Sequence, residues 1–136
     1  MMGCLLGLLV LSGAPALEAV AESPQETYRR YLAAIAAAER LEEIYAFLTE
    51  DRVATLIAGL EGAELAGQDP RVVESTTLSL LKVGAEAPAV YKEYVIDDEA
   101  SVVVERAETM IEVLMILEDG RWQIADERFI RMPVLQ

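Results

Sequence analysis

The sequence predicts one α+β domain, with N-terminal helices packed on one face of an antiparallel sheet of about four strands. Between residues 23 and 83, apolar side chains recur with the 3.6-residue period of amphipathic helices. After Pro88 the period changes to two, as in half-buried strands. The chain has 136 residues, of which 54% are hydrophobic and 26% charged. This length and composition suit a single domain with its own core.

The first 21 residues, MMGCLLGLLVLSGAPALEAVA, differ from the rest and predict a cleaved signal peptide. An apolar run is followed by Pro15 and by Ala19-Val20-Ala21, a small-x-small pattern that signal peptidase recognises. The run is shorter than the about 20 residues that a membrane span needs. Cys4 precedes the run, whereas a lipid-anchored cysteine follows it, so no lipid anchor is expected. We expect an exported protein, periplasmic or secreted, with a mature domain over residues 22–136 and no membrane span after processing.

Composition excludes several kinds of chemistry. The chain has no histidine, and its single cysteine, Cys4, lies in the expected signal peptide, which excludes Ser-His-Asp catalysis, histidine metal sites and disulfides from the mature domain. A net charge of −13 repels phosphate backbones and argues against nucleic-acid binding. The acidic run Asp97-Asp98-Glu99 is interpreted as a charged turn between strands. We therefore expect no metal and no cofactor.

Two helices are expected first. Ser23-Pro24-Gln25-Glu26 is a capping box with proline at the first helical position, and its helix runs to about Arg40. A short second helix contains Ile44, Tyr45 and Leu48. The apolar stripe of the first helix consists of Tyr28, Tyr31, Leu32 and Ile35.

Two further helices follow. Thr49 is a suitable N-cap for the third, and Gly59 and Gly62 are expected to end it. Asp69-Pro70 opens the fourth, which runs to about Val83. The side chains expected to be buried are Val53, Leu56, Ile57 and Leu60 in the third helix and Val72, Val73, Thr76, Leu80 and Leu81 in the fourth.

Four segments after Pro88 are expected to form strands joined by short turns. They read AVYKEYVI, ASVVVERA, TMIEVLMIL and RWQIADERFI.

This order of elements, with a tyrosine-rich first helix, a short second helix and hairpins that end in DGRWQI, resembles the nuclear transport factor 2-like superfamily, which includes the SnoaL-like proteins. The resemblance covers residues 23–131. It implies a cone-shaped, cystatin-like fold, in which a curved sheet wraps around a helix and often leaves a pocket at the open end. The superfamily includes isomerases, dehydratases, hydrolases and non-enzymatic binding or assembly domains, so the fold does not select the function.

The Asp119-Gly120 pair predicts the register of the last hairpin. A two-residue turn there places Glu118 opposite Arg121 and makes Leu117 and Trp122 neighbours on the core face. The same count puts three further pairs on that face: Met115–Ile124, Val113–Asp126 and Ile111–Arg128. The opposite face then carries Met110, Leu114, Ile116 and Phe129, with Glu112 opposite Glu127.

Apolar residues on the outer face of a sheet usually mark a contact with a partner. In the superfamily, that face is a common dimer interface. We therefore expect a homodimer whose interface includes Met110, Leu114, Ile116 and Phe129. The alternatives are that a loop or the N-terminal segment covers the patch, or that it is too small to matter.

Asp126 and Arg128 are polar residues on the predicted core face. Together with Tyr28 and Tyr31 they are candidate ligand-binding residues at the open end of the cone. A desolvated carboxylate beside a tyrosine is suited to proton transfer next to a carbonyl group. The alternative is a structural contact, between Asp126 and Arg128 or a tyrosine, that closes the pocket.

Three hypotheses for the function follow. The first is an exported, non-catalytic domain that binds a partner protein or a small apolar ligand. The second is a small-molecule isomerase or hydrolase of the SnoaL-like type that uses Asp126 with Tyr28 or Tyr31. The third is a structural subunit of the cell envelope. The volume and lining of the pocket distinguish them.

Overall fold

A computed structural model describes residues 22–86 and 88–130 of the chain. It confirms the α+β class: helices precede a four-stranded antiparallel sheet with the order β2-β3-β4-β5. The elements are α2 (Pro24–Ala37), η2 (Leu41–Phe47), α3 (Glu50–Leu65), α4 (Pro70–Lys82), β2 (Ala89–Ile96), β3 (Glu99–Arg106), β4 (Thr109–Glu118) and β5 (Arg121–Phe129). The expected signal peptide lies outside the described residues. In the part of the chain that is described, no helix has the length and apolar composition needed to cross a bilayer.

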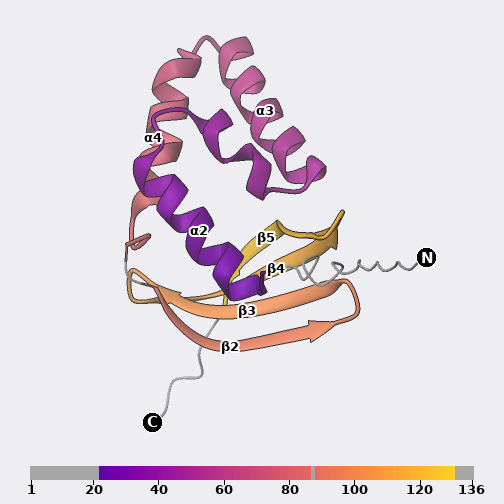
Figure 1. Cartoon of the computed structure of the whole chain (residues 1–136). Helices are drawn as coiled ribbons and strands as arrows, with labels where there is room; N and C mark the ends of the chain where they lie inside the picture. Colours follow the sequence, from indigo (N-terminus) through magenta and orange to yellow (C-terminus); the bar gives the residue numbers. More distant parts are fainter. Residues whose placement is uncertain (1–21, 87, 131–136) are drawn as a thin grey trace, which may run out of the picture.

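The sheet is curved, and α2 lies across its concave side, with η2, α3 and α4 beyond it (Figure 1). The predicted capping box opens α2: the Ser23 hydroxyl accepts from the backbone N–H of Glu26, and the Glu26 carboxylate accepts from that of Ser23. The helix ends at Ala37, three residues before the expected end. The Glu43 carboxylate accepts hydrogen bonds from the backbone N–H groups of Glu39 and Arg40 and so begins the short 3-10 helix η2.

Two expectations for α3 and α4 are wrong. Helix α3 continues through Gly59 and Gly62 and ends at Leu65, because both glycines keep helical geometry with open space around them. Helix α4 is rotated relative to the expected face: Val72 and Leu80 are 61% and 70% exposed. Its buried side chains include Glu74 and Leu78.

The rotation of α4 has a polar cause. The Glu74 carboxylate accepts from the backbone N–H of Leu41 at 2.7 Å and from Nε of Arg40 at 3.1 Å. These charge-assisted bonds bring the Glu74 face of α4 against the start of η2. A buried carboxylate with two donors therefore sets the orientation that apolar periodicity alone did not predict.

The β4–β5 hairpin confirms the turn and half of the predicted register. Asp119 and Gly120 both have positive φ, 53° and 76°, as a two-residue hairpin turn requires. The predicted pairing holds from Glu118–Arg121 to Met115–Ile124. A β-bulge follows, because Leu114 pairs with Asp126 and leaves Ala125 as an extra residue.

Beyond the bulge, every predicted pair is displaced by one residue. The observed pairs are Val113–Glu127, Glu112–Arg128 and Ile111–Phe129. The placement of Arg128 on the core face and of Phe129 on the outer face was therefore wrong. The bulge replaces the expected Glu112–Glu127 repulsion with an ion pair between Glu112 and Arg128, at 3.0 Å.

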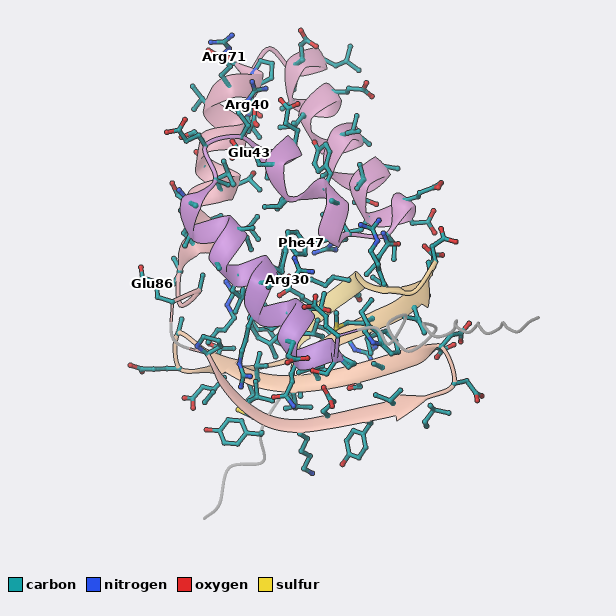
Figure 2. The ribbon with its side chains drawn as sticks, viewed as in Figure 1. Arg30, Arg40, Glu43, Phe47, Arg71 and Glu86 are labelled. Carbon is teal, nitrogen blue, oxygen red and sulfur yellow. The ribbon has the colours of Figure 1, made fainter. Side chains whose placement is uncertain are left out.

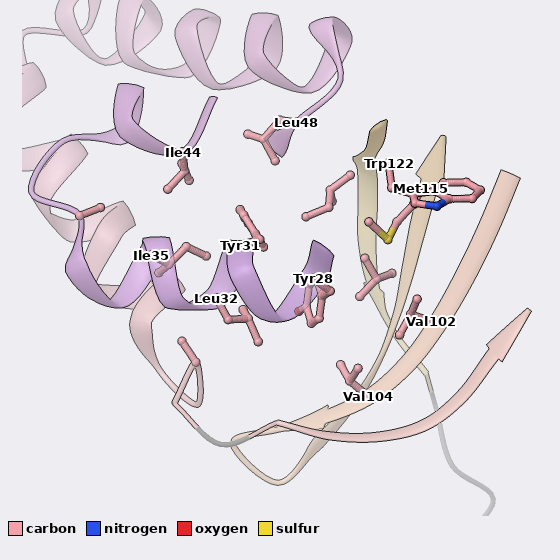
Figure 3. Packing of buried hydrophobic residues seen from close by; sticks show 14 of the residues in the cluster. Tyr28, Tyr31, Leu32, Ile35, Ile44, Leu48, Val102, Val104, Met115 and Trp122 are labelled. Carbon is pink, nitrogen blue, oxygen red and sulfur yellow. The ribbon is translucent and has the colours of Figure 1, made fainter. Parts of the chain in front are cut away.

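The core lies between α2 and the concave face of the sheet (Figure 3). Trp122 is buried, as expected, with 7% of its surface exposed. The large side chains that are most fully buried are Tyr28, Leu32, Ile35, Leu41, Ile44, Val102, Val104, Val113, Met115 and Ile124.

Candidate functional site

The most unusual buried residue is Arg106, which lies at the end of β3 and is 7% exposed. Its Nη1 donates to the hydroxyl of Tyr28 at 3.0 Å and to Oε2 of Glu127 at 3.3 Å. Its Nη2 donates to the backbone carbonyls of Leu81 and Val83. A buried guanidinium needs this neutralisation and these acceptors, because an unpaired buried charge is very costly. Arg106 therefore joins the C-terminal end of α4, the first helix and the last strand.

Tyr28 completes the cluster. Its hydroxyl donates a hydrogen bond of 2.7 Å to Oε2 of Glu127. Burial and the neighbouring charge of Glu127 raise the pKa of Tyr28 well above its ordinary value, so this tyrosine keeps its proton. We call Tyr28, Arg106 and Glu127 the polar cluster.

A pocket of about 390 Å³ opens beside the polar cluster, between the end of α4, the β3–β4 turn and the end of β5. Three of its wall residues are large apolar side chains that are otherwise exposed: Leu80 at 70%, Val83 at 56% and Phe129 at 79%. Exposed apolar side chains that gather in one place usually mark a binding site. The complete lining is Leu80, Leu81, Val83, Arg106, Ala107, Thr109, Ile111, Glu127, Arg128 and Phe129.

Gly84 holds one wall of this pocket in place. It has a φ of +74°, and a Cβ atom at this position would lie 2.6 Å from the backbone nitrogen of Ala107. Only glycine lets the segment after α4 approach the β3–β4 turn this closely. The pocket therefore depends on backbone contact as well as on its side chains.

The structure does not bring together the four predicted ligand-binding residues. Tyr28 belongs to the polar cluster, but Tyr31 lies in the core with its ring 5.7 Å from that of Phe47. Asp126 lies beside Arg52, at 3.6 Å. Arg128 lines the pocket while its guanidinium pairs with Glu112 on the outer face.

Two residues of the site, Arg106 and Glu127, were not expected from the sequence. A signal for Arg106 was present, because it continues the period of two set by the buried positions of β3: Ala100, Val102, Val104 and Arg106. A charged residue in phase with core positions indicates a buried ion pair or a site. Glu127 had no comparable signal, because the bulge at Ala125 decides whether it or Asp126 faces the core.

The predicted dimer surface is altered by the same bulge. Met110, Leu114 and Ile116 are partly exposed. Phe129, however, pairs with Ile111 and lines the pocket on the other side of the sheet. The charge of Glu112 is neutralised within the chain by Arg128. The Glu112 carboxylate also accepts a hydrogen bond of 2.7 Å from the Ser101 hydroxyl.

A second hollow, of about 340 Å³, lies between the start of α2, η2 and the β4–β5 turn. Arg30 stacks over the ring of Phe47 there, 5.3 Å from its centroid, and pairs with Glu22 (Figure 2). The lining of this hollow includes two arginines, Arg30 and Arg121, and Arg30 already has both an aromatic and an acidic neighbour. We therefore regard the apolar pocket beside the polar cluster as the candidate site.

Comparisons with protein-family models, curated proteins and solved structures found no match to this chain.

The Asp97-Asp98 pair forms the β2–β3 turn, with a φ of 56° at Asp97, as its charged-turn interpretation predicts. Within residues 22–86 and 88–130, no group of three or more cysteine or acidic side chains is arranged to hold a metal ion.

Proposed function

We propose that this protein is an exported, non-catalytic binding domain that holds a small apolar ligand in the pocket beside the polar cluster. The observation that carries the proposal is the convergence of Leu80, Val83 and Phe129 on that pocket. A pocket of about 390 Å³ is within the range of small-molecule sites, which are mostly apolar with a few placed polar groups. An apolar segment of a partner protein is the other occupant that suits such a lining.

The state of the polar cluster favours binding over catalysis. The single proton of the Tyr28 hydroxyl is directed at Glu127, and the raised pKa of Tyr28 opposes its loss. The same Glu127 oxygen also accepts from Arg106. An isomerase or hydrolase would need one of these groups to transfer a proton, and the Tyr28 hydroxyl and Oε2 of Glu127 are each already held by a neighbour. The geometry thus supports a site that positions a ligand.

The order of elements, the curved sheet and the pocket support membership of the nuclear transport factor 2-like superfamily, which we propose on these grounds.

Export is proposed from the pattern of residues 1–21. Mass spectrometry of the secreted or periplasmic protein should then find Glu22 at the N-terminus and no lipid. A chain that retains Met1 or Cys4 would contradict the proposed processing.

Binding can be tested with the neutral fluorescent probe N-phenylnaphthylamine, whose emission rises in apolar surroundings. We expect saturable binding with one site per chain. A Leu80→Ser, Phe129→Ser double variant should weaken binding by about tenfold, because both apolar wall contacts are lost.

The matched control is Leu65→Ser with Val72→Ser, which removes two exposed apolar side chains from α3 and α4 that do not line the pocket. It should leave the dissociation constant unchanged. Absence of saturable binding to the wild type, or equal affinity in the two double variants, would refute the proposed site and would favour a purely structural role.

We also propose that the protein forms a homodimer through the outer face of the sheet. Met110, Leu114 and Ile116 support this proposal, because they are partly exposed apolar side chains on one face of β4. The apolar residues of edge strand β2 extend the same surface: Tyr94 and Ile96 are 55% and 74% exposed. Phe129 is no longer part of this interface, since it faces the pocket.

A further inference from the structure

The two oxygens of the Glu127 carboxylate have different hydrogen-bond partners. Oε2 accepts from both Tyr28 and Arg106. Arg106 is in turn held by two backbone carbonyls at the end of α4. The carboxylate is therefore fixed in orientation by groups from three elements. Its side chain is 12% exposed and forms part of the pocket lining.

The other oxygen, Oε1, accepts no hydrogen bond from any group in the described part of the chain. It is also not sealed from solvent, because among those residues the only buried side-chain polar atom without a partner is Nε of Arg106. An ionised oxygen without a donor, on a side chain that lines an apolar pocket and is held in a fixed orientation, is a strong hydrogen-bond acceptor.

Most of the side-chain donors around the pocket already have an acceptor in the protein. Both terminal nitrogens of Arg106 donate within the cluster and to backbone carbonyls, and its Nε is out of reach of a ligand. The Arg128 guanidinium donates to Glu112, and the Thr109 hydroxyl donates to the Ala107 carbonyl. The pocket therefore offers a fixed acceptor, while its side-chain donors are mostly directed at other protein groups, so we expect the donor of the complementary pair to come from the ligand.

We propose that the ligand is an apolar molecule with a hydrogen-bond donor at one end, a hydroxyl or protonated amine, and that this donor binds Oε1 of Glu127. This inference rests on the proposed function of the same pocket. The net charge of −13 acts in the same direction, because it disfavours a ligand with a carboxylate head. Discrimination comes from the cost of leaving a buried acceptor unpaired when the ligand has no donor.

Two matched pairs of ten-carbon competitors, used to displace N-phenylnaphthylamine from the wild-type protein, test this proposal. Decanol carries a donor that decyl methyl ether lacks, and decylamine and decanoate carry opposite charges on the same chain. For a neutral ligand, we expect decanol to displace the probe at a concentration about tenfold lower than the ether does. For a cationic ligand, we expect decylamine to displace the probe at a concentration about tenfold lower than decanoate does. The first result identifies a neutral hydroxyl ligand and the second a cationic one.

Glu127→Gln links this preference to the proposed atom. The variant leaves Arg106 without its counter-ion, so the preference for decylamine over decanoate should disappear or reverse. Asp126→Asn is the matched control: it removes the same charge from the adjacent residue, which does not line the pocket. It should keep the wild-type order.

Several results would overturn the inference. One is that decyl methyl ether displaces the probe from the wild type as well as decanol does, and decanoate as well as decylamine. This comparison uses the wild type alone, so it remains valid even if Glu127→Gln does not fold. Another is an Asp126→Asn variant that changes the order as much as Glu127→Gln does. Binding of the probe without any head-group preference would reject this inference alone, whereas failure of the probe to bind would reject the proposed function.

Discussion

The hydroxyl of Tyr28 donates a hydrogen bond of 2.7 Å to the carboxylate of Glu127, and so joins the first described helix to the last strand. The same hydroxyl accepts from Arg106, so a single oxygen atom connects α2, β3 and β5. The contact fixes the polar end of the candidate pocket and also closes one side of the core. Stability and the proposed selection of a ligand therefore depend on the same three side chains.

Tyr28→Phe should lower the free energy of unfolding by about 1.5–3 kcal/mol, the usual loss for a buried hydrogen bond to a charged group. Tyr91→Phe is the matched control, because the Tyr91 hydroxyl makes a bond of the same length to Glu105 on the exposed outer face. Its effect should be much smaller, since solvent replaces the bond. Denaturant titration measures both, and equal losses would show that burial of the cluster contributes nothing.

Gly84→Ala should be more destabilising than Gly67→Ala. Both glycines have positive φ, +74° and +84°, so each alanine incurs the left-handed backbone penalty of about 1–2 kcal/mol. At Gly84 the new Cβ would also lie 2.6 Å from the Ala107 nitrogen, whereas nothing lies within 4 Å at Gly67. Thermal unfolding should show a larger loss of stability for Gly84→Ala than for Gly67→Ala. Gly84→Ala should also bind the fluorescent probe more weakly.

The acid stability of the protein should depend on Glu74. Its backbone hydrogen bond from Leu41 and the Arg40 guanidinium hold its pKa below the ordinary value of 4.5. The folded carboxyl binds a proton less tightly than the unfolded one, so its stabilising effect is complete above pH 4.5 and declines as the pH falls through the folded pKa.

Glu74→Gln should therefore lose less stability than the wild type when the pH is lowered from neutral to below 4.5. Glu61→Gln, a substitution at an exposed site on α3, is the control and should retain the wild-type slope. Denaturant titrations at several pH values give these slopes. Parallel curves for Glu74→Gln and the wild type would contradict the assignment.

Trp122→Ala should cost about 3–5 kcal/mol, as expected for truncation of a large core side chain. Phe129→Ala removes an aromatic ring that is 79% exposed and should change the free energy of unfolding by less than about 0.5 kcal/mol. A loss below about 1 kcal/mol for Trp122→Ala would mean that its ring contributes little to the core.

The proposed dimer can be tested with Leu114→Lys combined with Ile116→Lys. Sedimentation should find a wild-type dimer at micromolar concentration and a folded monomer for the double variant, because both side chains lie on the outer face. A wild-type monomer would reject the dimer. Unfolding of the double variant would show instead that these residues support the core.

Local sequence signals were sufficient for much of the fold. The capping box at Ser23, the cap and proline at Asp69-Pro70 and the turn at Asp119-Gly120 all act within a few residues, and each occurs where the sequence predicts it. The change from a period of 3.6 to a period of two located the four strands to within one or two residues. These features are predictable because propensity, capping and side-chain alternation are properties of neighbouring residues.

The candidate site was decided by tertiary structure. Alternation along β5 gives Asp126 and Glu127 opposite faces but does not say which one faces the core, and one extra residue at Ala125 reverses the outcome. The partners of Glu127 are Arg106 and Tyr28, which lie 21 and 99 residues away in the sequence. The bulged register is favoured because it lets Glu127 form an ion pair with the buried Arg106. Arg106 belongs to β3, so the sequence of β5 alone does not indicate this pairing.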